Sequence, residues 1–152
     1  LRLNVLSSFL DTYQLQVSPQ SALIDIFGTN GPAGGAQYDY RMFSTLSYSR
    51  GPFSTSLRWR HYPSIKHSTY RANKNTPTEG SAKYDIFDLS GRYSFNEKYD
   101  MRFGIDNLLD KDPPIHGRQV VNFPFNSGTG QTINSVYDVL GRRAYVGFTA
   151  NF

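Results

Sequence analysis

The sequence contains no cysteine, and this excludes both a disulfide framework and a thiolate metal site. Charged residues are also scarce, at 18% of the 152 residues against roughly 25% in an average soluble domain. No stretch approaches the roughly 18 consecutive apolar residues that a membrane-spanning helix needs. Any membrane-spanning structure in this chain therefore has to be built from strands.

Basic clusters are missing, although the net charge is +4. The Lys and Arg residues are scattered singly, and Arg142-Arg143 is the only adjacent pair. A nucleic-acid-binding domain gathers its positive charges into a patch or a stripe. The charge pattern therefore predicts no nucleic-acid partner.

Patterns typical of catalytic and metal sites are missing as well. His61, His67 and His116 lack the spacing of metal ligands, so we interpret them as surface histidines. The run 128–132 has neither the Lys nor the spacing of a phosphate-binding P-loop. Nothing in the sequence brings a Ser, a His and an Asp together. We expect a protein that is not an enzyme and that has no cofactor, metal or catalytic residue.

Aromatic residues, in contrast, are abundant. They make up 15% of the chain, with 11 Tyr and 11 Phe, while the mean hydropathy is only −0.50. The wall of a transmembrane β-barrel accounts for this mixture, because alternate residues face lipid and lumen and the average hydropathy cancels.

Apolar and polar residues alternate with period two in six segments, which predicts six strands. The segments are roughly 1–15, 40–50, 53–62, 84–95, 99–108 and 142–152. In the first segment Leu3, Phe9 and Tyr13 fall on one face, and in the second Phe43 interrupts the polar face. No helical period competes over a comparable window.

The last three segments separate their two faces most cleanly. We predict that the apolar set faces lipid: Phe87, Leu89, Phe103, Ile105, Val146 and Phe148. We predict that the polar set faces the lumen: Asp88, Arg92, Arg102 and Thr149.

The connections alternate in length. Residues 50–52 and 96–98 form tight turns, whereas 16–39, 63–83 and 109–141 are long and rich in Gly, Pro, Asn, Ser and Thr. In an up-and-down barrel this alternation places all long loops on one side of the membrane. We expect the long loops to be extracellular and the turns to be periplasmic.

Six strands are too few for a closed transmembrane barrel, which needs about eight. Six would leave two open edges, and lipid does not tolerate unpaired backbone groups. The chain also opens at Leu1 in strand-like alternation, without an initiator Met or a signal peptide. We therefore expect either a fragment of a larger barrel or one protomer of a shared barrel.

Four parts of the chain resemble outer-membrane proteins. Apolar residues recur at every second position from Ala144 to Phe152, which resembles the end by which the assembly machinery recognises outer-membrane barrels. The run 104–111, Gly-Ile-Asp-Asn-Leu-Leu-Asp-Lys, is similar to the Gly-x-x-Asn-Leu-Phe-Asp-Lys run that ends the penultimate strand of TonB-dependent receptors, with Leu109 in place of Phe. The Gly141-Arg142 pair before the last strand, and the segment 50–60, also resemble this family.

The resemblance implies a barrel of about 22 strands around an N-terminal plug. Residues 1–152 would be the C-terminal part of the barrel domain, and the plug, which contacts the TonB protein, would lie outside this chain. It further implies energy-dependent uptake of a nutrient such as a saccharide or a siderophore across the outer membrane of a Gram-negative bacterium. The expected partners are outer-membrane lipid, the TonB protein, the barrel assembly machinery at Phe152, and a ligand that the sequence does not identify.

Two groups of charged residues allow more than one interpretation. Asp110 and Asp112 can bind Ca²⁺, but two carboxylates before Pro113-Pro114 are more typical of a turn. Arg58 and Arg60 share a polar face, where they can meet an anionic ligand or, as we favour, pair with a plug or with other strands.

Four alternatives to the receptor remain open. A passive porin or an autotransporter would share the terminal Phe, and a barrel enzyme such as a phospholipase would need a Ser–His pair at the lumen edge. A soluble β-sandwich that binds polysaccharide would bury its apolar faces against each other and would lack aromatic bands at the strand ends.

Overall fold

The computed structural model describes residues 1–16, 18–31, 35–67, 73, 75, 80–115, 132 and 136–151. These residues form strands, turns and irregular segments, and no helix occurs among them. A helix of the length and hydropathy needed to cross a membrane is accordingly not found in this part of the chain.

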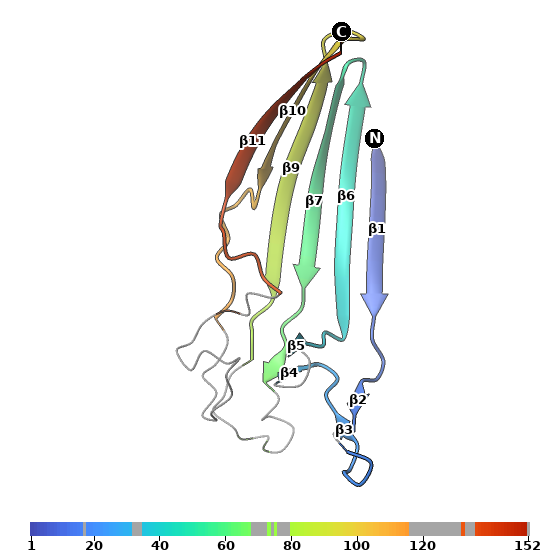
Figure 1. Cartoon of the computed structure of the whole chain (residues 1–152), viewed down its shortest axis with the longest axis vertical. Coiled ribbons are helices and arrows are strands. Elements are labelled where there is room, and N and C mark those ends of the chain that lie inside the picture. The colour runs from blue at the N-terminus through green and yellow to red at the C-terminus, as the bar shows by residue number, and fades with distance from the viewer. Residues whose placement is uncertain are drawn as a thin grey trace.

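A six-stranded antiparallel sheet dominates the fold (Figure 1). Its strands, in spatial order, are β1 (Arg2–Phe9), β6 (Tyr40–Arg50), β7 (Phe53–Tyr62), β9 (Tyr84–Ser94), β10 (Tyr99–Asp106) and β11 (Arg143–Ala150). Spatial order follows chain order, so the sheet is an up-and-down meander, and all six predicted strands are confirmed.

Five short strands lie in the long connections. These are β2 (Gln14–Leu15), β3 (Ile24–Asp25), β4 (Thr29–Gly31), β5 (Gly35–Ala36) and β8 (Lys66–His67). They form a β2–β3 pair and a β5–β4–β8 sheet at the end of the long sheet opposite the two hairpin turns (Figure 1). We call these two ends the loop end and the turn end.

The first strand is shorter than predicted. It stops at Phe9, and the Leu10 amide then donates a hydrogen bond to the Asp39 carbonyl at 2.9 Å. The placement of Tyr13 on the apolar face of this strand was therefore wrong. The physical reason is that the partner strand β6 begins at Tyr40, opposite Phe9, so that β6 offers no further ladder to residues 10–15.

The sheet is open among the described residues. Strand β1 pairs only with β6, and β11 pairs only with β10. The up-and-down sheet is thus observed, whereas its closure into a barrel remains a prediction.

The strand register sorts the side chains onto two faces. One row runs across all six strands through directly paired residues: Leu3, Leu46, Leu57, Leu89, Ile105 and Ala144. Because successive side chains point to opposite faces, this register places the whole predicted lipid-facing set on the side of that row and the predicted lumen-facing set on the other. We call these sides the apolar face and the polar face, and the predicted division between them is confirmed.

The two hairpin turns are stabilised in different ways, one by a glycine with positive φ and the other by side-chain hydrogen bonds. Gly51 has φ +56° and, with Pro52, forms a two-residue loop between the paired residues Arg50 and Phe53. Gly at the first central position is what a type II′ hairpin requires. At the other turn the Asn96 Oδ1 accepts hydrogen bonds from the amides of Lys98 and Tyr99 at 2.9 and 3.0 Å, which holds the chain reversal in place.

The Asn107–Lys111 turn ends β10 and joins three strands. Asn107 is fully buried, has φ +51°, and donates its amide hydrogen to Asp88 Oδ1 of β9 at 3.0 Å. Its side chain bonds both backbone groups of Lys111, accepting from the amide at 2.8 Å and donating to the carbonyl at 3.0 Å. Asp110, with φ +52°, accepts from the amide of Arg142 at 3.0 Å just before β11. The turn interpretation of Asp110 is thus confirmed.

We predict that Asn107→Ala lowers the free energy of unfolding by about 3 kcal/mol. Two part-buried hydrogen bonds to the Lys111 backbone would be lost, at about 1 kcal/mol each, and alanine at positive φ adds about 1 kcal/mol. Asn107→Gly is the matched control, because it loses the same hydrogen bonds but tolerates the left-handed backbone. Urea unfolding followed by circular dichroism should rank wild type above Gly and Gly above Ala. Equal stability of the Ala and Gly variants would contradict the left-handed turn.

Candidate functional site: the two faces of the sheet

The apolar face is not covered by any described element. Phe9, Val146 and Phe148 are 80%, 75% and 65% exposed, and Leu3 is 63% exposed. A sheet with one apolar face normally buries it against a second layer. Soluble monomers rarely expose contiguous apolar patches larger than a few hundred Å². This face therefore requires an apolar partner that the described residues do not supply.

Aromatic rings gather in two bands on the apolar face. The loop-end band consists of Phe9, Tyr40, Trp59, His61 and Phe87, and the turn-end band consists of Tyr48, Phe53, Tyr93, Phe95, Tyr99 and Phe148. Neighbouring rings are in contact, with centroids 5.6 Å apart for Tyr40 and His61 and 4.9 Å apart for Tyr93 and Phe95. Between the bands lie aliphatic and small residues, together with the Phe103 ring, which covers Gly91 so closely that a Cβ there would collide with it.

Both bands run obliquely across the strands in the same direction. Tyr48 is in register with Thr55, Gly91 and Phe103 on the next three strands, but the turn-end band reaches Tyr99 on β10, four residues beyond Phe103. From Tyr48 to Tyr99, four residues over three strand steps are about 13 Å along the strands and about 14 Å across them, which corresponds to a strand tilt of about 40°. On the next strand the band returns by two residues, because Phe148 is paired with Met101.

The loop-end band shifts in the same way. At one side of the band, Phe9 of β1 is paired with Tyr40 of β6. At the other side, Phe87 of β9 and its partner Trp59 are level with Ser44 of β6, which lies four residues closer to the turn end than Tyr40. The two bands are therefore parallel. Tyr40 and Tyr48 are eight residues apart on β6, about 27 Å along the strand, or about 20 Å between bands after correction for the tilt.

A hydrogen-bonded network anchors the loop-end band. Asp85 Oδ1 accepts from Trp59 Nε1 at 2.9 Å and lies 2.7 Å from His61 Nδ1, and His61 Nε2 lies 3.2 Å from the Tyr40 hydroxyl. Every polar atom named here has a partner, which lowers the cost of placing a carboxylate on the apolar face. The interpretation of His61 as a surface histidine was therefore wrong, because its side chain is only 13% exposed and both ring nitrogens have partners.

The polar face carries most of the sheet's charge. It presents seven arginines and three aspartates, and no lysine or glutamate within the six strands: Arg2, Arg41, Arg58, Arg60, Arg92, Arg102, Arg143, Asp88, Asp100 and Asp106. Arg60 pairs with Asp88 on the neighbouring strand, with its Nε 3.0 Å from Oδ2. For Arg60 the predicted pairing with another strand is thus confirmed, whereas Arg58 has no ion pair among the described residues.

The polar face is hollowed toward the turn end. The hollow has a volume of about 570 Å³, and its floor contains the serines Ser47, Ser49, Ser54, Ser56 and Ser90. Arg92, Arg102 and Tyr145 also line it. The Tyr145 ring covers Gly104, where an added Cβ would lie 2.5 Å from the ring. Small side chains on three neighbouring strands therefore leave a space that is lined by hydroxyl groups and two guanidinium groups.

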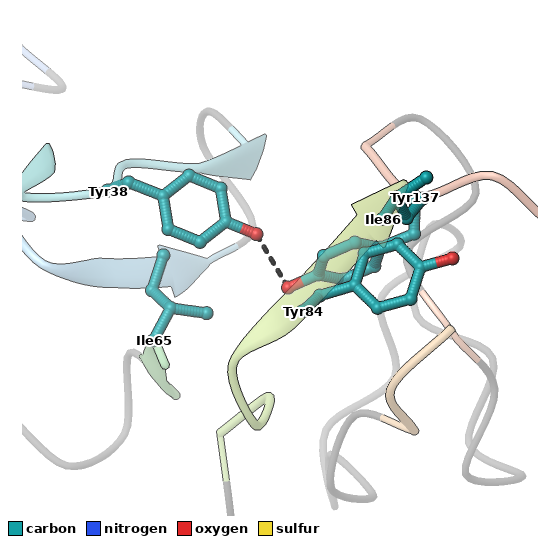
Figure 2. Packing of buried hydrophobic residues seen from close by; sticks show 5 residues of the cluster. All are labelled: Tyr38, Ile65, Tyr84, Ile86 and Tyr137. Carbon is teal, nitrogen blue, oxygen red and sulfur yellow. Dashed lines mark hydrogen bonds between the residues drawn. The ribbon is translucent and has the colours of Figure 1, made fainter. Parts of the chain in front are cut away.

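At the loop end, the long connections fold back over the polar face (Figure 2). Tyr38, Ile65 and Tyr137 come from the connections and pack with Tyr84 and Ile86 of β9, and all five are at least 94% buried. Figure 2 shows the hydrogen bond that the Tyr38 hydroxyl donates to the Tyr137 hydroxyl, at 2.5 Å. We call these five residues the cap, and they form the hydrophobic core of the described chain. Burial and this hydrogen bond raise the pKa of Tyr38 far above its ordinary range.

His67 lies beside the cap, two residues after Ile65, and is only 1% exposed. The interpretation of His67 as a surface histidine was therefore wrong, while His116 lies outside the described residues. Phe152 and much of the 109–141 loop also lie outside them. The described part of the chain contains no cluster of three or more His, Cys, Asp or Glu that could hold a metal ion.

No family model, curated protein or solved structure matches this chain. Function has to be argued from the two faces, the cap and the turns themselves.

We predict that the cap loosens as the pH falls, because of His67. Burial lowers the pKa of His67 below its ordinary value of 6.5. The unfolded segment then binds a proton more readily than the folded one, so stability is retained above pH 6.5 and declines as the pH falls below it. Amide exchange of residues 62–67, corrected for intrinsic rates, should be faster at pH 5.5 than at pH 7.5, and His67→Gln should reduce this difference. A His67 ring resonance that titrates at or above pH 6.5 would contradict the prediction.

Proposed function

We propose that this chain forms part of the wall of an outer-membrane β-barrel, with its apolar face against lipid and its polar face toward the lumen. The observation that carries this proposal is the pair of parallel aromatic bands on an uncovered apolar face. Transmembrane barrels have an outward apolar zone of about 25 Å flanked by aromatic girdles, on strands tilted by about 35–45°. The obliquity of the bands agrees with the second value, and their separation of about 20 Å is somewhat smaller than the first.

The pairing of the strands supports the same proposal. In lipid every backbone group needs a partner within the protein, so the free edges of β1 and β11 have to be paired. Since a closed barrel needs about eight strands, the missing strands belong to the rest of the protein or to further copies of it. The resemblance to the larger receptors favours the first of these.

A soluble β-sandwich fits these observations poorly. It would bury the apolar face against a second sheet, and it would have no reason to place rings in oblique bands at both ends of the strands. In addition, the core of the described chain is the cap, which lies on the polar face. A lumen partly covered from the loop end by folded connections is consistent with a barrel that handles a solute.

Within the outer-membrane barrels, we propose a TonB-dependent receptor that takes up a nutrient. The support comes from the run Gly104–Lys111, which resembles the family and in which the named residues have structural roles. Asn107 holds Lys111, Asp110 holds Arg142, and Gly104 makes room for Tyr145. The ligand, the plug and the TonB protein belong to the part of this proposal that rests on resemblance.

The proposed orientation of the faces can be tested on β11, because the chain has no native cysteine. We predict that a bimane label on Val146→Cys is quenched by brominated lipid chains, while the same label on Thr149→Cys is quenched only by aqueous iodide. Val146 and Thr149 lie on opposite faces of one strand, so each is the other's control. The full-length protein, free of other cysteines, would be reconstituted in vesicles. Aqueous quenching at Val146 would overturn the membrane proposal.

A second measurement separates the receptor from a passive porin. A receptor whose lumen is filled by a plug should give no steady conductance in a planar lipid bilayer, because the plug blocks the path of hydrated ions. A reconstituted general porin of known conductance is the control for insertion and detection. Stable open channels formed by the full-length protein would replace the TonB-dependent receptor by a porin.

A further inference from the structure

Two arginines are directly opposed across neighbouring strands of the polar face. Arg92 of β9 and Arg102 of β10 are register partners, and both line the hollow toward the turn end. Like charges in directly opposite positions destabilise a sheet. The repulsion between Arg92 and Arg102 therefore destabilises the pairing of β9 and β10, and the strand pairing itself gives no reason for two arginines at these positions.

Only one of the two charges is neutralised by a neighbour. Arg92 makes a two-bond ion pair with Asp100, from Nη2 to Oδ2 at 2.7 Å and from Nε to Oδ1 at 3.0 Å. Asp100 also accepts a hydrogen bond from the Ser94 hydroxyl at 2.6 Å. Arg102 is exposed and forms no ion pair with any residue that the structure describes. Within this part of the chain, Arg102 is thus left without an ion pair of its own, although it attracts the Asp100 carboxylate that Arg92 already binds.

The surroundings of Arg102 provide further donors. The serine floor supplies hydroxyl groups, and two of them, in Ser56 and Ser90, are hydrogen-bonded to each other at 3.1 Å, so that only one of this pair has a hydrogen left to donate. Guanidinium groups bind carboxylate and phosphate oxygens through paired N–H groups, and hydroxyl groups complete the shell around such an anion. The volume of about 570 Å³ lies within the range of about 300–1,000 Å³ of small-molecule sites.

We propose that this hollow binds a small solute that carries a phosphate or carboxylate group, with Arg102 and Arg92 facing the anion and the serines facing its remaining oxygens. The inference rests on the proposed function, since it takes the polar face to line a lumen. The site would lie between the cap and the turn end, where a solute that has passed the loops would next meet the wall. It narrows the class of nutrient to an anionic one.

The inference favours a small solute over an acidic segment of the same protein for two reasons. The floor is made of short side chains, whereas a docked protein surface would be matched by larger complementary groups. The Arg102 guanidinium group and the serine hydroxyl groups also line one hollow and are not spread evenly along the wall.

The test is isothermal titration of the full-length protein in detergent micelles with inorganic phosphate and with citrate. We expect saturable binding of at least one probe, weakened about tenfold or more by Arg102→Gln, as expected for the loss of a charge-assisted hydrogen bond. Arg102→Lys should give an intermediate affinity, because it keeps the charge but loses the paired N–H groups. Arg58→Gln is the matched control, since Arg58 is an exposed arginine of the same face that does not line the hollow.

Equal affinities of wild type and Arg102→Gln would overturn the inference, and so would an equal loss in Arg58→Gln, which would indicate attraction by the general charge of the wall. Absence of binding by wild type, together with lower thermal stability of Arg102→Gln, would also overturn it and assign the hollow to an acidic segment of the protein. The quenching experiment with the label on Val146→Cys tests the membrane proposal independently of this titration. Circular dichroism of each variant establishes that it is folded.

Discussion

The strand register is the constraint on which the other features of the sheet depend. A slip of one residue at any pair would send Leu57 or Leu89 to the polar face and Arg58 or Asp88 to the apolar face. The observed register avoids this across five successive pairings, and it joins six short amphipathic patterns into one surface. The aromatic bands exist only as a product of this register, because no strand contains more than a few of their rings.

Several local contacts maintain that register. The two-residue turn at Gly51-Pro52 fixes β6 against β7, and the Asn107 turn fixes β10 against β9 through Asp88. Asp88 also binds Arg60 of β7, so a single carboxylate joins β7, β9 and the end of β10. Buried polar groups of this kind are costly unless each is satisfied, and a slipped register would leave them unpaired. Polar contacts on one face thus specify the position of apolar residues on the other.

The sequence was sufficient to predict the strands and their faces, because both follow from local alternation. It also predicted that the chain leaves the strand in the run 107–110, since the alternation stops there, and β10 does end at Asp106. The cap was missed for a physical reason. Tyr38, Ile65 and Tyr137 are single apolar residues in polar loops, and only the folded chain brings them to Tyr84 and Ile86. The high aromatic content was a signal for such contacts, but it does not indicate which rings meet.

The network of Asp85, His61 and Tyr40 was missed for the same reason, since its members come from three strands and meet through long-range pairing. The oblique bands could not be predicted from the sequence either, because they depend on the relative shift of neighbouring strands and not on any one segment. The hollow combines both difficulties. Its serines look like ordinary strand residues in the sequence, and Arg92 and Arg102 are ten residues apart until β9 and β10 pair.

Because successive side chains of a strand point to opposite faces, the two faces of the proposed barrel wall can serve different functions. Lipid is a uniform solvent, so the apolar face needs only the right width and rings at its borders. The lumen face has no such requirement, and there charge can be placed wherever a solute or a neighbouring strand makes it favourable. The exclusive use of arginine among the cations of this face is consistent with paired hydrogen bonding to oxyanions, for which lysine is less suited. Since a substitution at an even position of β9 leaves the odd positions unchanged, the solute that the wall contacts can be altered without altering how the wall sits in lipid.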